Sequence, residues 1–361
     1  MRILFFGDYS NVHNTLADEM RKLGHEVNVA SDGDAWKNYK RDIDINYQSK
    51  FKFLMFLIKM ILDKRFRGND VVQIINYRFL FKNKLGSFNK YVFDFLKRNN
   101  KKVILCAYGD DYFVVEGHKN HKLKYSPVSV LDSEIPYMQE IFEVHHSDLA
   151  KKLNTYIADN SDGIVSCMYD YYVCYKDLYP QKLKNIPLPI DLEKIKYSDN
   201  VVKDKINIFF GLQKSRIEWK GGDIILKVLN EIKEKYPEKV DVKLVENVPY
   251  EEYIKMFTES NLFFDQTYLY SQGMNGLLAL AAGKVLFGGG EPENYELNNE
   301  KENFPIVNIT ADEEDIKTKI IHFIQHPEET LDIGRNSHRY IQQHHDSVKI
   351  AKDYLEYYQS V

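Results

Sequence analysis

Two positively charged side chains stand four positions apart in the second half of the sequence, just before a pair of glycines. Arg216 and Lys220 precede Gly221-Gly222, and the segment follows an apolar run that is typical of a strand. The glycines lead into a predicted helix, whose N-terminus carries a partial positive charge. Two cations beside a helix N-terminus suit a diphosphate, because the charges and the helix dipole act on the same anion. A solvated basic turn is the alternative interpretation.

A second candidate binding segment is rich in glycine and small polar residues. The run DQTYLYSQGMNGLLALAAG spans residues 265–283 and places a loop between a predicted strand and a predicted helix. Glycines would let backbone amides approach a phosphate or a sugar closely. The candidate binding residues are Gln272, Gly273, Met274, Asn275 and Gly276. Alternatively, the small residues only permit tight packing of the helix on its sheet.

Two turns in the first half also follow predicted strands. In the turn at residues 7–11, backbone N–H groups would suit an anion or sugar hydroxyls, with Ser10 and Asn11 as the candidate contacts. The turn lacks the G-x-G-x-x-G pattern, so a dinucleotide cofactor is poorly supported. Asp110 and Asp111 end another strand, where a carboxylate could orient a hydroxyl group or stabilise a cationic transition state. For both turns, a helix cap is the alternative.

These segments lie within an alternating pattern of apolar strands and amphipathic helices. The predicted strands are 2–6, 25–30, 70–75, 102–107 and 163–167 in the first half, and 205–210, 241–245, 261–265, 284–287 and 306–309 in the second. Continuous apolar strands that alternate with helices predict parallel sheets covered on both faces. The proline-containing segment 186–190 predicts an extended crossing between the halves. We therefore predict an α/β fold of two Rossmann-like doubly wound domains, with ligands in a central cleft beyond the strand ends.

The length and the cysteines are consistent with this organisation. At 361 residues, with 44% hydrophobic and 28% charged residues, the chain is too long for one ordinary core and suits two globular domains. Cys106, Cys167 and Cys174 have no metal-ligand spacing, so we expect no metal, no disulfide framework and a reducing, cytoplasmic compartment. The N-terminal apolar run is too short for a secretion signal.

One segment of the first half is strongly basic. Residues 35–102 hold 17 Lys and Arg against 5 Asp and Glu, although the whole chain has a formal net charge of −4. Within this segment, residues 50–67 surround a short apolar run with basic side chains, and the run is well below the roughly 20 residues that span a bilayer. The apolar positions at helical spacing are Phe53, Leu54, Phe56, Leu57, Met60 and Ile61, and the basic ones are Lys50, Lys52, Lys59, Lys64, Arg65 and Arg67.

This pattern predicts a basic amphipathic helix that contacts an anionic membrane surface. The alternative is a core-facing helix with a solvated basic face. A nucleic-acid partner is not expected, because no recognised nucleic-acid-binding module accompanies the charge.

Taken in order, these segments resemble retaining glycosyltransferases of the family-4 type, the GT-B enzymes of bacterial polysaccharide synthesis. The matching pieces are SNVHNTLADEMRKLGHEV at 10–27, LPIDLEK at 188–194, R-x-x-x-K-G at 216–221, the glycine-rich run at 265–283 and H-H-D at 344–346. The resemblance implies transfer of a sugar from a UDP- or GDP-sugar to a glycan or lipid-linked acceptor, without a required metal or other cofactor and with retention at the anomeric carbon.

The resemblance also implies a division of labour along the chain. Residues 1–188 would form the acceptor domain, 189–340 the donor domain, and 341–361 a C-terminal helix that packs back on the first domain. Arg216 and Lys220 would neutralise the departing diphosphate. Residues 272–276 would hold the donor. Asp110 or Asp111 would act as the catalytic carboxylate facing the acceptor, and Ser10 and Asn11 would lie on the acceptor side.

One departure from the family concerns two glutamates eight positions apart, which fall here on Tyr270 and Leu278. A leucine cannot accept a hydrogen bond from a ribose hydroxyl. Glu291 and Glu293 are the nearest acidic candidates, with an ordinary acidic loop as the alternative. The departure leaves two rival hypotheses open. The chain could be a non-catalytic GT-B subunit of glycan assembly, or a sugar-nucleotide epimerase on the same scaffold.

Overall fold

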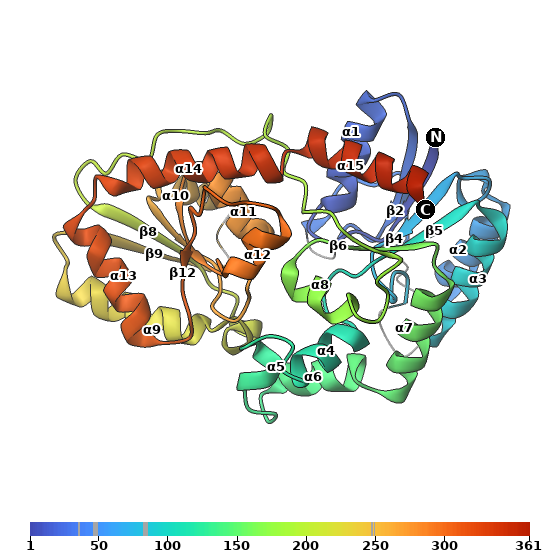
Figure 1. Cartoon of the computed structure of the whole chain (residues 1–361), viewed down its shortest axis with the longest axis horizontal. Helices are drawn as coiled ribbons and strands as arrows, with labels where there is room; N and C mark the ends of the chain where they lie inside the picture. The colour runs from blue at the N-terminus through green and yellow to red at the C-terminus, as the bar shows by residue number, and fades with distance from the viewer. Residues whose placement is uncertain (35–36, 46–49, 82–85, 247, 249) are drawn as a thin grey trace.

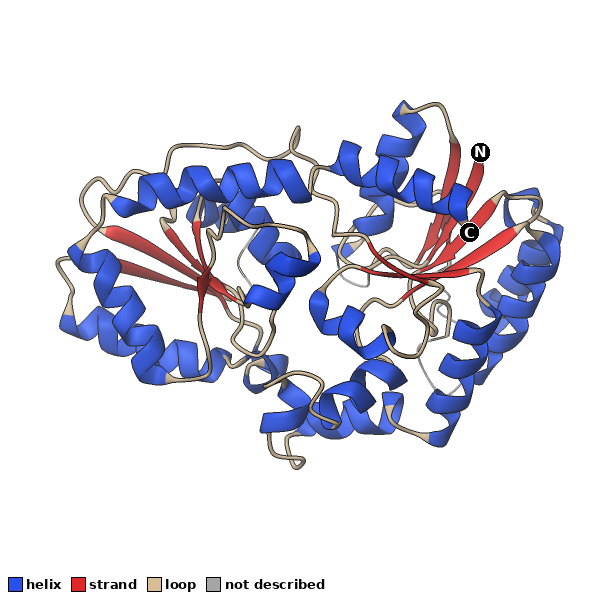
Figure 2. Cartoon of the chain, viewed as in Figure 1, coloured by secondary structure: helices blue, strands red, loops and turns tan. Residues whose placement is uncertain are grey.

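The computed structural model describes residues 1–34, 37–45, 50–81, 86–246, 248 and 250–361, with the side chains of 50–52, 250 and 251 left aside. Parts of the basic segment, including the side chains of Lys50 and Lys52, therefore lie outside the described residues. Two parallel sheets form two lobes, each with helices on both faces (Figures 1 and 2). The predicted α/β class with two doubly wound domains is confirmed.

The first sheet has the strand order β3-β2-β1-β4-β5-β6-β7. Its strands are β1 (Arg2–Phe6), β2 (Glu26–Ser31), β3 (Ile43–Asp44), β4 (Val71–Ile74), β5 (Lys102–Cys106), β6 (Gly163–Ser166) and β7 (Leu183–Asn185). Its helices are α1 (Val12–Lys22), α2 (Lys50–Leu62), α3 (Asn89–Asn99), α4 (Tyr112–Lys119), α5 (Pro127–Val130), α6 (Pro136–His145), α7 (Asp148–Asn160) and α8 (Tyr169–Tyr175). The central strand β1 pairs through Ile3 with Val27 of β2 and Val71 of β4. Apolar side chains on both faces of such a strand are buried under helices, which explains its continuous apolar sequence.

The second sheet has the order β12-β11-β10-β8-β9. Its strands are β8 (Ile206–Gly211), β9 (Val240–Val245), β10 (Leu262–Phe264), β11 (Val285–Gly288) and β12 (Val307–Asn308). Its helices are α9 (Gly222–Lys235), α10 (Tyr250–Glu259), α11 (Met274–Ala281), α12 (Pro292–Leu297), α13 (Glu313–Gln325) and α14 (Glu329–His344). The short helical turns η4 (Lys214–Arg216) and η5 (Glu218–Lys220) lie between β8 and α9. None of the helices in the described residues is both long and apolar enough to cross a membrane.

The last helix, α15 (Ser347–Ser360), leaves the second lobe and packs on the first (Figure 1). At the crossing, the N–H of Ile190 donates to the carbonyl of His345 at 2.7 Å, and the N–H of Ser347 donates to the carbonyl of Ile190 at 3.0 Å. The hydroxyl of Tyr358 then donates to Oε1 of Gln73 on β4 at 2.7 Å. The predicted return of the C-terminal helix to the first domain is confirmed.

Two edge strands of the first sheet were not among the predicted strands. β3 has two residues and β7 has three, and neither contains a run of fully buried side chains. The sequences of β3 (ID) and β7 (LKN) lack the largely apolar run that predicted the comparably short edge strand β12 within residues 306–309.

Candidate functional site

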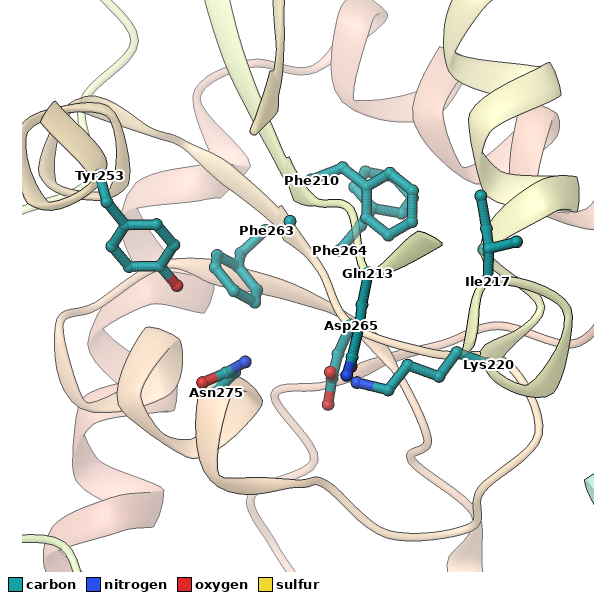
Figure 3. A pocket seen from close by; sticks show the side chains of 11 residues that line it. Phe210, Gln213, Ile217, Lys220, Tyr253, Phe263, Phe264, Asp265 and Asn275 are labelled. Atoms are coloured by element: carbon teal, nitrogen blue, oxygen red, sulfur yellow. The ribbon is translucent and has the colours of Figure 1, made fainter. Parts of the chain in front are cut away.

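Lys220 lines a pocket at the carboxyl ends of β8 and β10. The pocket is small and partly open to solvent. Its lining residues are Phe210, Gly211, Gln213, Ile217, Lys220, Gly222, Tyr253, Phe263, Phe264, Asp265 and Asn275. Figure 3 shows the ammonium of Lys220 directed toward the carboxylate of Asp265, with Asn275 on the neighbouring wall. We call this the Lys220 pocket.

Charge inside the Lys220 pocket is set mainly by Lys220 and Asp265. Burial raises the pKa of Asp265, while the nearby Lys220 ammonium and a hydrogen bond from the Gly273 backbone N–H lower it. Asn275, at the start of α11, is exposed and supplies an amide that can both donate and accept. The pocket therefore combines a cation, a carboxylate and an amide with an aromatic wall, as expected for a polar ligand with an apolar part.

The glycines after Lys220 are required by the backbone. Gly221 has φ of +63° and occupies the N-cap position of α9. A Cβ placed on Gly221 would lie 2.0 Å from Oγ1 of Thr267, so a side chain would clash with the loop after β10. The predicted helix start is present, and its glycines bring Lys220 close to the loop that begins at Asp265.

Arg216 lies outside the lining of the Lys220 pocket and faces the first domain. Its guanidinium carbon is 4.6 Å from the ring centroid of Tyr137 on α6, and Trp219 packs edge-on against the same ring at 5.1 Å. Burial raises the pKa of Asp110 to about 6, and the positive charge of Arg216 opposes that rise. The two cations predicted to act as a pair therefore have different surroundings, since Lys220 lines the pocket and Arg216 contacts Tyr137 of the first domain.

Asp110 and Asp111 are adjacent but have different surroundings. Asp111 is the N-cap of α4, where its carboxylate accepts from the N–H of Val114 at 2.9 Å and from the hydroxyl of Tyr175 at 2.5 Å. Its side chain is buried, and burial raises its pKa to about 7. Asp110 keeps partial solvent access near Arg216. The structure thus assigns the capping role to Asp111 and leaves Asp110 facing the other domain.

The turn after β1 contains Ser10 and Asn11, both with positive φ, of 52° and 66°. The N–H of Ser10 donates to the carboxylate of Asp34 at 3.0 Å, and the ammonium of Lys37 donates to the same carboxylate at 2.7 Å. Asn11 occupies the N-cap position of α1, but its side chain makes no capping hydrogen bond. The N–H of Ser10 is therefore already hydrogen-bonded to Asp34, whereas the side-chain amide of Asn11 does not cap α1.

Sequence reasoning missed two residues near Asp110. The pKa of Tyr9 is raised by burial and by the charges of Asp32, Asp34 and Asp110, and it is lowered by Arg78. These charges therefore gather around one phenol at the carboxyl end of the first sheet. Tyr9 and Arg78 both follow strands of that sheet, so the position of residues after strand ends was the signal that could have found them.

Residues 272–276 have two roles: some of them pack inside the protein, and one lines the Lys220 pocket. Nε2 of Gln272 donates to the carbonyl of Gly289 at 2.7 Å inside the protein. A Cβ on Gly276 would lie 3.1 Å from Cδ2 of Leu286, so this glycine permits close helix packing. Gly273 is the N-cap of α11, and Met274 packs partly against the core. Asn275 is the member of this segment whose side chain lines the pocket.

The middle of the same loop joins the two domains. The carboxylate of Asp170, at the start of α8, accepts from the N–H groups of Tyr270 and Ser271 at 2.8 and 3.1 Å. The phenol of Tyr270 accepts from the N–H of Lys124 at 2.8 Å, and its ring stacks on Tyr169 with 5.7 Å between centroids. Tyr270 therefore connects the domains at the position where the family has a glutamate. Leu278, at the second glutamate position, packs partly against the core.

Glu291 belongs to this same connection. Its buried carboxylate accepts from the hydroxyl of Tyr125 at 2.7 Å and from Nδ2 of Asn308 at 2.7 Å. Lys124 lies 3.1 Å from Glu293 and 3.8 Å from Glu291. We call the set Lys124, Tyr125, Tyr169, Asp170, Tyr270, Ser271 and Glu291 the domain joint. Glu291 is thus neither an exposed acidic loop residue nor directed into the Lys220 pocket.

Residues that could hold a metal ion were expected to be absent, and the relevant part of the chain is the part that the structure describes. No group of three or more His, Cys, Asp or Glu side chains there could hold a metal ion.

The fold is that of the GT-B glycosyltransferases. Sucrose-phosphate synthase from Thermosynechococcus elongatus aligns with a TM-score of 0.65 at 12% identity, over 100% of this chain and 99% of that one. HepE from Anabaena, solved with UDP and glucose, aligns with a TM-score of 0.64 at 14% identity over 100% of both chains. UDP-GlcNAc 2-epimerase from Neisseria meningitidis, bound to UDP-GlcNAc, aligns with a TM-score of 0.55 at 12% identity over 100% of both chains.

The sequence itself matches a protein family in its second half. Residues 216–356 fit the family described as glycosyl transferase-like. This stretch begins at Arg216 and includes Lys220, Asp265 and Asn275 of the Lys220 pocket. No curated protein matches the chain by sequence. The predicted resemblance to GT-B glycosyltransferases is confirmed.

Proposed function

We propose that this protein transfers a sugar from a nucleotide-sugar donor, UDP- or GDP-linked, to a glycan or lipid-linked acceptor with retention at the anomeric carbon. The observation that carries the proposal is the Lys220 pocket, which lies at the strand ends of the domain whose sequence fits the glycosyl transferase-like family. Solved structures of the same fold with UDP and glucose or UDP-glucose support a nucleotide-sugar ligand.

In this proposal the negative charge of the leaving diphosphate is stabilised by Lys220 and Arg216. Charge grows on that group as the glycosidic bond breaks, so fixed cations stabilise the transition state more than the ground state. Asn275 and the first-turn amides of α11 would contact the donor. Asp110, whose pKa burial raises to about 6, would orient the acceptor hydroxyl at neutral pH as a carboxylate.

The acceptor would bind residues 1–188, on the side of Ser10 and Asn11, and the donor would bind residues 189–340. Residues 341–361 would fasten the donor domain to the acceptor domain. The three cysteines are free and buried, which supports a cytoplasmic site of action, and a lipid-linked acceptor would place the protein on the inner face of the membrane.

The test is calorimetric titration with UDP and GDP. One nucleotide is expected to bind, and Lys220→Ala is expected to weaken it about tenfold or more, because a hydrogen bond to a charged group contributes roughly 1.5–3 kcal/mol. Lys214→Ala is the matched control, since Lys214 is exposed on the same turn and pairs with Glu246 at 2.7 Å. The proposal would be overturned if neither UDP nor GDP bound. It would also be overturned if the nucleotide bound equally tightly after Lys220→Ala plus Arg216→Ala.

The structure also gives a reason to test an epimerase. UDP-GlcNAc 2-epimerases share the fold along the whole chain, and the glutamate positions of the transferases are occupied by Tyr270 and Leu278. Incubation with a single nucleotide sugar and no acceptor separates the two activities. An epimeric nucleotide sugar would favour the epimerase. Free nucleotide released only when an acceptor is present would favour the transferase, and no turnover of any donor would favour a non-catalytic subunit.

A further inference from the structure

Helix α2 has two apolar faces. Its inner face packs on the first domain, where Phe53 meets the ring of Phe81 at 5.0 Å and Phe56 meets Phe66 at 6.2 Å. Its outer face carries five large apolar side chains that remain exposed, among them Leu62 at 75% and Leu54 at 54%. We call these five the outer stripe: Leu54, Met55, Ile58, Ile61 and Leu62. The sequence-based alternative, a helix with one core face and an otherwise solvated basic face, does not describe this surface.

The outer stripe is a continuous face of the helix. Its members follow the spacing i, i+1, i+4, i+7 and i+8, which places them on one side of an α-helix. Large apolar side chains scattered singly on a surface need no explanation, but a contiguous exposed set marks an interaction surface. α2 lies at the outer edge of the first lobe, away from the second lobe (Figure 1).

The ring contacts of the inner face of α2 lead, through the buried Phe81, to two exposed aromatic side chains, Phe88 and Tyr91. Phe81, which contacts Phe53, also contacts Phe88 at 6.0 Å between ring centroids, and Phe88 contacts Tyr91 at 5.9 Å. Phe88 and Tyr91 are both exposed. Tyrosine combines an apolar ring with a hydroxyl and suits the boundary between lipid and water.

The charge next to the outer stripe is positive. Lys59 and Lys64 are exposed, and neither forms an ion pair with a residue in the described part of the chain. The one carboxylate between them, Asp63, is held by Arg65 at 2.6 Å. At 100° per residue, Lys59 lies at the border of the stripe rather than opposite to it. A basic border around an apolar face complements an anionic leaflet, whereas lysine is depleted from the cores of protein–protein interfaces.

We propose that the outer stripe of α2 docks on the surface of an anionic lipid bilayer, with the helix lying in the headgroup layer. The apolar side chains enter the boundary of the acyl chains while the lysines contact lipid phosphates. α2 begins six residues after β3 ends, so its N-terminal end lies toward the carboxyl edge of the first sheet, where Ser10 and Asp110 also lie. A docked helix would therefore bring this edge close to a lipid-linked molecule. The docking surface stands independently of the transfer reaction.

The test is co-sedimentation of the full chain with phosphatidylcholine vesicles that either lack phosphatidylglycerol or contain about 30 mol% of this anionic lipid. We expect binding to the anionic vesicles and at least about tenfold weaker binding to neutral ones. Ile58→Gln plus Leu62→Gln should reduce binding about tenfold or more, since burial of these side chains supplies apolar attachment. Lys59→Ala plus Lys64→Ala should reduce binding to anionic vesicles and leave the residual binding to neutral vesicles unchanged.

The matched control is Leu149→Gln plus Leu178→Gln, two side chains that are similarly exposed (each 53%) but lie outside α2. This control should bind vesicles like the unmodified protein. Absence of binding to anionic vesicles, or an equal loss in the control, would overturn the proposal. So would a dimer in sedimentation velocity that Ile58→Gln plus Leu62→Gln dissolves, because the stripe would then cover a second copy. Nucleotide binding should persist in all these variants, so failure here is distinct from failure of the proposed activity.

Discussion

The domain joint and the Lys220 pocket draw on the same loop, yet they use its polar groups in opposite ways. In the middle of the loop, Tyr270 and Ser271 give their N–H groups to Asp170 of the other domain. At its two ends, Asp265 and Asn275 line an open pocket together with Lys220. The middle of the loop is thus used by the contact between the domains, while Asp265 and Asn275 on either side of it line the pocket.

The largest expected effect breaks the joint. Asp170→Ala removes the acceptor of two buried N–H groups, and each unsatisfied buried donor costs roughly 1–3 kcal/mol, so we expect the free energy of unfolding to fall by about 2–4 kcal/mol. The measurement is chemical denaturation followed by tryptophan fluorescence and circular dichroism. Lys220→Ala, in the pocket, should leave stability within about 0.5 kcal/mol of the unmodified protein. Equal stability of the two variants would contradict a structural role for Asp170 that Lys220 does not share.

A second expected effect concerns Asp110, which faces Arg216 across the domains. Burial raises the pKa of Asp110 to about 6, so the carboxylate is ionised at pH 7 and becomes protonated as the pH falls through 6. If the carboxylate orients the acceptor, kcat/KM should fall below pH 6. Asp110→Asn should remove this limb and lower the rate about 100-fold.

Arg216 provides the control for this pH profile. Its charge lowers the pKa of Asp110, so Arg216→Ala should move the acidic limb to higher pH. A limb that stays in place in both Arg216→Ala and Asp110→Asn would assign the titration to another group.

The smallest expected effect removes one hydroxyl from the joint. Tyr125→Phe deletes the hydrogen bond to Glu291 but leaves the one from Asn308, so we expect a loss of about 1 kcal/mol in the free energy of unfolding and unchanged nucleotide affinity. Tyr91→Phe is the matched control, because Tyr91 is largely exposed and lies outside the joint. A loss of nucleotide binding in Tyr125→Phe would show that the joint and the pocket are coupled.

Much of the fold could be predicted because its strands are apolar without interruption. β1 and β5 could be predicted from the sequence for this reason. The C-terminal helix was expected on the first domain, where the hydroxyl of Tyr358 donates a hydrogen bond to Gln73. The edge strands β3 and β7 were missed because their sequences, ID and LKN, contain no apolar run, whereas the comparably short edge strand β12 lies within the largely apolar run 306–309 and was predicted.

The site was less predictable because neighbouring residues can point to different surroundings. Asp110 and Asp111 share a turn, but only Asp111 meets the hydroxyl of Tyr175, a contact set by a helix distant in sequence. Likewise, the hydrogen bond from the N–H of Tyr270 to the carboxylate of Asp170 joins residues 100 positions apart and depends on how the domains meet. Local spacing identifies which residues follow the end of a strand, but not which of their side chains form structural contacts in the folded protein.

The hydrogen bond between Tyr358 and Gln73 has a consequence for biosynthesis. Gln73 of β4 is synthesised 285 positions before Tyr358, so its buried amide meets its phenol partner only after α15 has been made. The N-terminal domain therefore cannot complete its interior until α15 has left the ribosome, although N-terminal domains usually fold first. Ribosome-bound chains that stop before residue 347 should expose the α15-binding surface of the first domain to chaperones, and chains in which α15 has emerged should cover it.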